Sequence, residues 1–156
     1  MLQPAENIVE SYIYFAKYGS QYHTCKELRA MWERQGHKKE DIDWWILLEK
    51  RVKVGETASY ETRKNNLRYQ NGVDIYRRVK FMGTKDDRLF IEAYIRAKYA
   101  ANPNMEHIGN DYFNCANRNT IKGAENKFFA YVTEAFELLS QIKNKNYTFE
   151  CEIVRS

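Results

Sequence analysis

Two stretches of the chain hold the residue types that could bind a ligand. Residues 51–90 carry 10 basic and 5 acidic side chains, so the positive excess behind the net charge of +4 lies in this segment. Surface cations contact the phosphates of nucleic acids, and tyrosine rings placed among them add aromatic surface with a polar tip. The segment therefore predicts a phosphate-contacting surface. Its candidate residues are Arg68, Arg77, Arg78 and Lys80.

The second stretch is the polar start of the last predicted helix, which spans 119–143. Its candidate DNA-contacting residues are Asn117, Arg118, Asn119, Thr120 and Lys122. Arginine can pair with guanine, and asparagine with adenine, through two hydrogen bonds each, which suits contact with a DNA major groove. Asparagine and threonine are also good helix N-caps, so a purely structural role for this end of the helix stays open.

Other kinds of site find little support in the sequence. His23 and Cys25, and likewise His107 and Cys115, lack the paired short spacings of a zinc site. The chain has no Gly-x-Ser-x-Gly elbow and no glycine-rich phosphate loop. We therefore expect no enzyme activity, no metal and no cofactor.

The composition is that of one soluble globular protein, with 44% hydrophobic and 29% charged residues over 156 positions. The three cysteines are scattered and form no CxxC pair, which indicates a reducing compartment. No apolar run approaches the ~20 residues of a membrane helix. The first residues lack the apolar segment of a secretory signal. We expect a cytoplasmic protein without membrane contact.

Helical periodicity dominates the secondary-structure signals. Ile8, Tyr12 and Phe15 recur at helical spacing, and Thr84 followed by Asp87 has the pattern of a capping box. Residues 146–154 alternate weakly and predict a terminal strand. The helices predicted on these grounds span 5–18, 24–35, 38–50, 84–101, 105–113 and 119–143.

The helix predicted over 38–50 is apolar nearly all round. Such a helix is buried on more than one side. We therefore expect at least one of Trp44 and Trp45 to be buried.

Residues 51–82 allow two interpretations. Asn71-Gly72 between alternating apolar residues predicts a β-hairpin near 66–80. The alternative is a long basic helix that breaks at Gly72.

The helix over 119–143 repeats apolar residues at spacings of 3 and 4 from Ile121 to Ile142, which is a heptad seam. A second apolar stripe lies beside the seam, so the helix has two faces to cover. Both faces could be covered inside the domain, or one could be covered by a second copy of the chain. The homodimer hypothesis rests on four seam residues, Ile121, Phe128, Tyr131 and Leu138.

Residues 105–112, a turn, and then Thr120-Ile121-Lys122 with Ala124 and Phe128 resemble the helix-turn-helix of sigma-factor region 4. The layout is similar to phage late-gene transcription regulators, both the autolysin-regulator-type activators and the Q antitermination proteins. The resemblance covers about 84–140. It implies binding to double-stranded DNA, with RNA polymerase or another host protein as a further partner.

Together these observations predict a mainly α fold, a compact helical domain with a helix-turn-helix-like C-terminal half and a small β-hairpin near 66–80. Residues 1–83 would form a helical, winged-helix-like part and residues 84–156 the helix-turn-helix-like part, in one compact unit. The expected function is that of a DNA-binding transcription regulator of phage or mobile-element type. The alternative is a protein–protein interaction module, such as a phage-encoded inhibitor or adaptor of a host protein.

Overall fold

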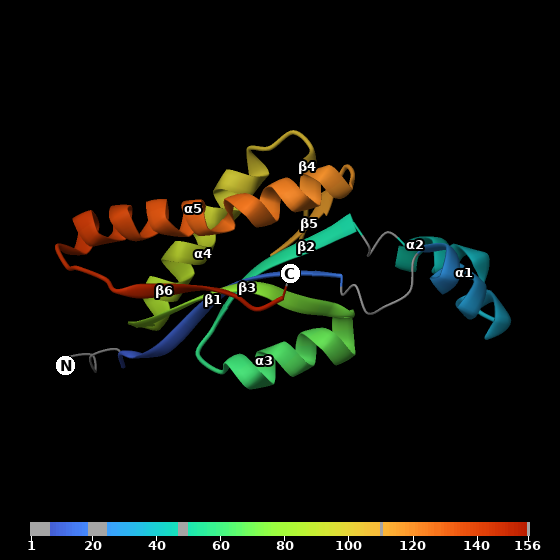
Figure 1. Ribbon diagram of the computed structural model, residues 1–156, viewed down its shortest axis with the longest axis horizontal. Helices are drawn as coiled ribbons and strands as arrows, with labels where there is room; N and C mark the ends of the chain where they lie inside the picture. Colours follow the sequence, from blue (N-terminus) through green and yellow to red (C-terminus); the bar gives the residue numbers. More distant parts are fainter. Residues whose placement is uncertain (1–6, 19–24, 47–49, 110, 156) are drawn as a thin grey trace, which may run out of the picture.

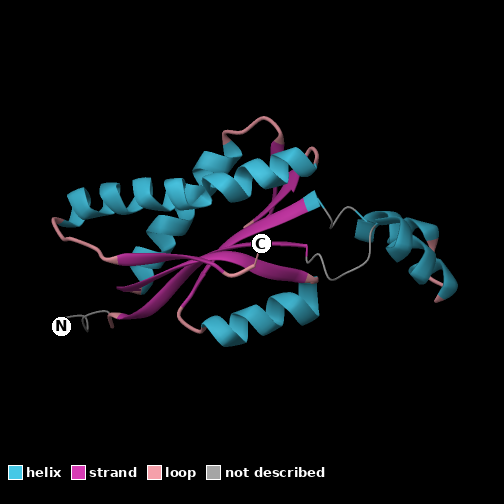
Figure 2. Cartoon of the chain, viewed as in Figure 1, coloured by secondary structure: helices cyan, strands magenta, loops and turns pink. Residues whose placement is uncertain are grey.

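A computed structural model describes residues 7–18, 25–46, 50–109 and 111–155, without the side chains at 25–29, 43–46, 70 and 71. Six antiparallel strands form one sheet in the order β4-β5-β2-β1-β3-β6, with helices on both of its faces (Figure 1). The mainly α prediction is therefore wrong, because a sheet built from both halves of the chain forms the centre of the fold (Figure 2). The strands are β1 (Val9–Tyr18), β2 (Arg51–Thr57), β3 (Val73–Gly83), β4 (Met105–Gly109), β5 (Tyr112–Cys115) and β6 (Phe149–Ile153). The helices are α1 (Cys25–Arg34), α2 (Lys39–Ile46), α3 (Tyr60–Asn66), η2 (Leu67–Asn71), α4 (Lys85–Ala100) and α5 (Arg118–Lys143).

Strand β1 lies at the centre of the sheet, where a helix over 5–18 was predicted. Residues 11–16 of this strand are all buried, because β2 and β3 flank it and side chains cover both of its faces. A strand buried on both faces shows no alternation of apolar and polar residues. The helical spacing of Ile8, Tyr12 and Phe15 is therefore a coincidence within a nearly continuous apolar run.

The larger core lies between one face of the sheet and the two long helices α4 and α5 (Figure 1). Ile13 and Phe15 of β1 face it, together with Val79 of β3. Phe128 and Phe136 of α5 complete it, and each has almost no exposed surface. This packing requires both apolar stripes of α5.

The smaller core lies on the opposite face of the sheet, beneath α3 and η2. Tyr12, Tyr14 and Ala16 of β1 pack there against Leu67 and Ile75. Successive side chains of β1 thus point into the two cores in turn, as in any β-strand. Both cores are apolar, so this alternation is not visible in the sequence.

The hairpin predicted near 66–80 does not form. Helix α3 continues into η2, a segment of π-helix, and Gly72 ends it in the left-handed conformation with φ 67°. The alternative of a long basic helix broken at Gly72 holds only for residues 60–71, because β2 occupies 51–57 and β3 follows Gly72. Asn-Gly suits a helix C-cap as well as a hairpin turn, since both need a positive φ.

The helix predicted over 105–113 is also wrong, because this segment forms the β4–β5 hairpin. Phe113 and Cys115 alternate into the larger core, while Tyr112 and Asn114 lie on the other face. The structure therefore has no first helix for a helix-turn-helix at this position. The long α5 follows a strand instead.

Several predicted elements are confirmed. Helices α1, α4 and α5 lie where the sequence places them, and β6 lies within the strand predicted over 146–154. Thr84 and Asp87 form the predicted capping box at the start of α4. Helix α2 is described over Lys39–Ile46, and residues 47–49 of the predicted helix, together with the side chains of Trp44 and Trp45, lie outside the described part of the structure.

Figure 1 shows α1 and α2 side by side beyond the ends of β1 and β2, away from the other helices. Among the described residues, no helix is long and apolar enough to span a membrane.

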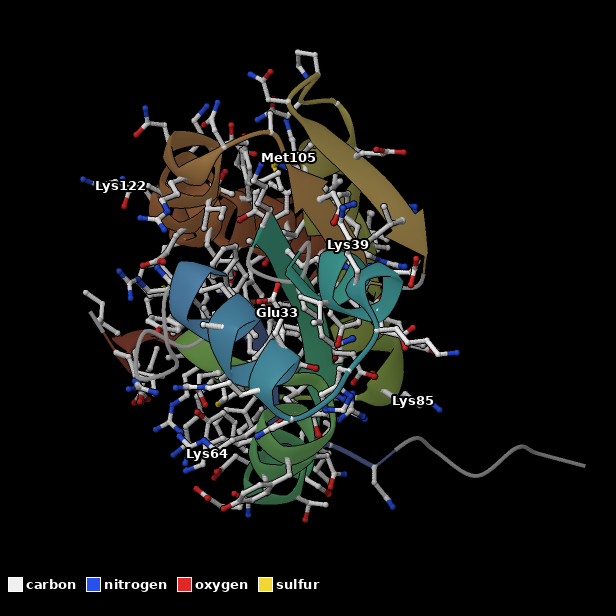
Figure 3. The ribbon with its side chains drawn as sticks, turned by 90° about the vertical axis from the view of Figure 1, so that its right-hand side faces the viewer. Glu33, Lys39, Lys64, Lys85, Met105 and Lys122 are labelled. Atoms are coloured by element: carbon white, nitrogen blue, oxygen red, sulfur yellow. The ribbon has the colours of Figure 1, made fainter. Side chains whose placement is uncertain are left out.

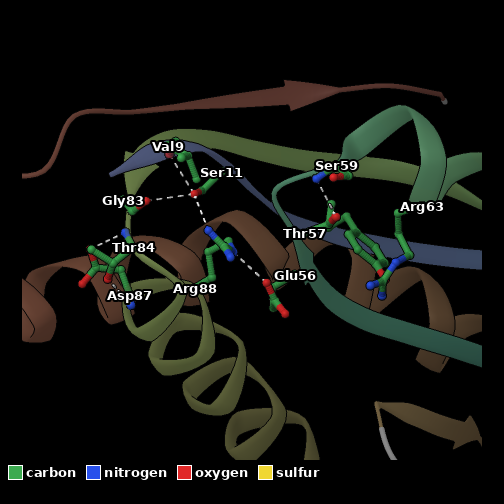
Figure 4. A network of polar contacts seen from close by, with 11 residues as sticks. Val9, Ser11, Glu56, Thr57, Ser59, Arg63, Gly83, Thr84, Asp87 and Arg88 are labelled. Carbon is green, nitrogen blue, oxygen red and sulfur yellow. Dashed lines mark hydrogen bonds and ion pairs between the residues drawn. The ribbon is translucent and has the colours of Figure 1, made fainter. Parts of the chain in front are cut away.

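A buried arginine joins α4 to the sheet (Figure 4). Arg88 donates to the Oγ of Ser11 in β1 at 3.0 Å and to Glu56 in β2 at 2.8 Å. Its guanidinium is thus paired and hydrogen-bonded, as a buried charge requires. This arginine belongs to the basic segment of the sequence, but here it stabilises the fold.

Candidate functional site

The amide hollow is a cavity of about 330 Å³ at the N-terminal end of α5. Its lining comes from α4, from the turn that follows α4, and from the first turns of α5. The lining residues are Tyr99, Asn102, Asn104, Asn117, Asn119, Thr120, Gly123, Ala124, Lys127 and Tyr131. Three of the five residues predicted to contact DNA at this helix end, Asn117, Asn119 and Thr120, are therefore among them.

The turn after α4 is fixed by hydrogen bonds of its own. The Oδ1 of Asn102 accepts from the backbone N–H of Asn104 at 2.9 Å, and the carbonyl of Asn104 accepts from the N–H of Ala116 at 2.9 Å. The second bond ties the turn to the segment just before α5. The two sides of the hollow are thus held at a set separation.

Asn117 starts α5 as its N-cap. Its Oδ1 accepts from the backbone N–H of Thr120 at 2.9 Å, with extended backbone at φ −160°. The structural interpretation of this residue is therefore confirmed. The Oδ1 of Asn102 and the Oδ1 of Asn117 each already accept a hydrogen bond within the chain, so the Nδ2 donors are the groups that these amides offer most readily to a ligand.

Two tyrosines form the aromatic part of the lining. The hydroxyl of Tyr99 is buried and donates to the carbonyl of Ala124 at 2.6 Å, and burial raises its pKa well above the ordinary value. It is thus a neutral donor at neutral pH. The ring of Tyr131 lies edge-on to Tyr99, with centroids 5.5 Å apart, and is half-buried.

The charged side chains that line the hollow are of one sign. None of the ten lining residues is acidic, and one of them is Lys127. Lys122 and Arg118 are exposed on the same end of the helix, and Figure 3 shows Lys122 at the outer edge of the molecule. Within the described part of the chain, neither Lys122 nor Lys127 forms an ion pair. This end of α5 thus offers hydrogen-bond donors and cations to an anionic, acceptor-rich ligand.

The four cations predicted from the basic segment have a different environment. Each forms an ion pair with a carboxylate of this chain, and three of these carboxylates lie far away in the sequence. The pairs are Arg68–Asp74, Arg77–Glu125, Arg78–Glu152 and Lys80–Glu10, with N···O distances of 2.8, 2.8, 2.6 and 3.7 Å. The local excess of positive charge is thus largely neutralised in the folded protein.

The four seam residues do not lie on one surface. Ile121 and Phe128 are buried in the larger core, Tyr131 lines the amide hollow and Leu138 is exposed. The seam that the spacing predicts is thus mostly internal. The part that faces solvent is short.

A second polar cluster was missed in the sequence. Burial, with the nearby carboxyl of Asp111, raises the pKa of Glu92 to about 8. Arg96 lies 3.4 Å from Glu92 and 3.1 Å from Asp111. The only sign of this cluster in the sequence is the spacing of four residues from Arg88 to Glu92 and from Glu92 to Arg96, which places these side chains on one face of a helix. Among the described residues, no group of three or more His, Cys, Asp or Glu side chains could hold a metal ion.

Comparison with family models, with curated proteins and with solved structures finds no match to this chain.

Proposed function

We propose that this chain is a non-enzymatic nucleic-acid-binding protein whose contact surface is the end of α5 that carries the amide hollow. The supporting observation is the lining of the hollow, which holds four asparagines and a lysine and no acidic residue. Phosphates are bound by lysine, arginine and amide side chains, and by the backbone N–H groups at helix starts.

The surface differs from the one expected from the sequence. Arg118, Asn119 and Lys122 remain candidates because they are exposed. The four candidate cations of the basic segment form ion pairs within the fold. A role in transcription rested on a helix-turn-helix, and residues 105–115 form a hairpin instead. The proposal is therefore for nucleic-acid binding, with double-stranded DNA as the first ligand to test.

The test is binding of labelled random-sequence DNA, duplex and single-stranded, at several salt concentrations. We expect affinity to fall steeply as salt rises, because bound cations release counterions from the phosphates. Replacing both Lys122 and Lys127 by alanine should weaken binding. It should also lower the steepness of the log–log salt dependence by about two if each lysine contacts one phosphate.

The matched control replaces Lys39 and Lys85, two exposed lysines labelled elsewhere on the molecule in Figure 3. This variant loses the same amount of positive charge, but at positions outside the amide hollow. It should therefore keep nearly all of the affinity for DNA. The proposal fails if the chain binds neither form of DNA, or if the two double variants bind alike. The protein–protein interaction alternative would then be favoured.

A further inference from the structure

Helix α5 contains a glycine, Gly123, at a position where neither the backbone conformation nor close packing requires one. Gly123 lies in the second turn, its φ is not positive, and a Cβ built on it would meet nothing within 4 Å. Glycine inside a helix costs about 1 kcal/mol relative to alanine. Neither backbone conformation nor packing within the described residues explains that cost.

A ligand bound in the amide hollow would account for a glycine at position 123. Gly123 is one of the lining residues, so a side chain there would take up part of the 330 Å³. Glycine is the residue that lets a ligand approach the backbone closely. A volume of 330 Å³ is at the small end of the range for ligand pockets, which suits one planar group rather than a large cofactor.

The lining matches the parts of a nucleotide. Tyr131 offers a half-buried ring, and bases of single strands stack on such aromatic side chains. The amide donors of Asn102 and Asn117 suit the acceptor atoms of a base, since their own oxygens are already bonded. Lys127 is exposed and suits the adjoining phosphate.

We propose that the amide hollow holds one unstacked nucleotide of a single-stranded nucleic acid, with its base against Tyr131 and its phosphate at Lys127. The absence of a side chain at Gly123 leaves room for this nucleotide. This inference rests on the proposed function and deepens it, because it names the form of nucleic acid that the site selects. A paired base within a duplex is stacked and cannot enter the hollow. The chain should therefore bind single strands more tightly than duplexes of the same sequence.

The first test fills the hollow. Gly123→Leu should lower the affinity for a labelled oligothymidylate about tenfold, while its weaker affinity for duplex DNA stays unchanged. Ala130→Leu is the matched control, since Ala130 is exposed on the same helix and outside the lining. Circular dichroism and the unfolding midpoint show that both variants are folded.

The second test concerns the ring. Tyr131→Ala should lower single-strand affinity about tenfold, a loss within the range of one base–aromatic stack. Tyr131→Phe keeps the ring and should restore the affinity. Tyrosine fluorescence of the unmodified protein should be quenched by oligothymidylate and not by duplex DNA.

The outcomes separate the inference from the proposed function. Binding to neither duplex nor single strand refutes the proposed function itself. Equal affinity for both forms, or a Gly123→Leu variant indistinguishable from the Ala130→Leu control, overturns the nucleotide site and leaves phosphate-driven binding in place. Thymidine 5′-monophosphate binding as tightly as the oligonucleotide also overturns it, because the hollow would then serve a free nucleotide. The same titration is repeated with an oligoribonucleotide. A similar loss of affinity in the Gly123→Leu variant supports the inference for RNA, and an unchanged affinity contradicts it for RNA.

Discussion

At the scale of single residues, a side chain in this protein acts according to the partners that the fold supplies. Arg88 belongs to the basic segment of the sequence, and it lies buried between Ser11 and Glu56. Gly55 shows the same dependence on neighbours, because a Cβ at this position would collide with the ring and hydroxyl of Tyr14. Both roles depend on strand β1, which packs beside residues distant in the sequence.

Glu92 gives the residue-scale prediction. Its carboxyl ionises near 4.5 in the unfolded chain and near 8 in the folded protein, because burial and the Asp111 carboxyl oppose the negative charge. Between these pH values the folded state holds a proton that the unfolded state has released. Stability therefore falls as pH rises through this window, by at most about 1.4 kcal/mol per pH unit.

Glu92→Gln removes the titrating group, so the free energy of unfolding should decline less between pH 5 and pH 8 than in the unmodified protein. Urea unfolding at intervals across this range measures both slopes. Glu137→Gln, on the exposed face of α5, serves as control and should keep the original slope. Parallel curves for Glu92→Gln and the unmodified protein would show that Glu92 does not hold the proton.

At the scale of elements, the start of α4 joins two distant parts of the chain. Asp87 closes the capping box with Thr84 and also contacts Lys143 at the end of α5 and the hydroxyl of Tyr147. Burial alone would raise the pKa of Asp87, but these hydrogen bonds lower it below the ordinary value. The cap thus holds α4 against the end of α5.

Thr84→Ala should lower the free energy of unfolding by about 1 kcal/mol, the usual cost of a lost N-cap. Thr84→Ser keeps a hydroxyl that can accept from the N–H of Asp87 and should lose only a fraction of this. Chemical denaturation of the three proteins measures the difference. A Thr84→Ala variant as stable as the serine variant would mean that the hydroxyl does not cap the helix.

At the scale of the whole molecule, α5 decides whether the fold needs a second copy. Both of its apolar stripes contribute to the larger core, with Phe128 and Val132 fully buried. A seam used in this way is not available to a partner. The exposed large hydrophobic residues of α5 are limited to its last turns, at Leu138 and Ile142.

Phe128→Ala should lower the free energy of unfolding by about 3–5 kcal/mol, the cost of emptying a buried aromatic site. The unfolding midpoint of the unmodified protein should not depend on protein concentration, because the partner of Phe128 is the chain's own sheet. Denaturation at low and high protein concentration checks this. A midpoint that rises with concentration would favour the homodimer that the heptad spacing predicted.

Local chemistry in the sequence was enough to place several elements. The capping box of Thr84, the long apolar repeat of α5 and the weak alternation of β6 each involve neighbours within a few positions, and each was confirmed. The sequence also predicted ligand binding at the polar start of α5, which stays a prediction. Its Asn117 proved to be the N-cap that the sequence allowed.

The tertiary structure alone decided the sheet and the surroundings of the site. Strand β1 is buried on both faces, so its pattern carries no strand period, and a helix was predicted in its place. The β4–β5 hairpin is too short for periodicity to separate it from a helix. Arg77 forms an ion pair with Glu125, which lies on α5. A local sequence pattern cannot predict a partner so distant in the chain. The amide hollow likewise forms between segments that the β4–β5 hairpin brings together, where the carbonyl of Asn104 accepts from the N–H of Ala116.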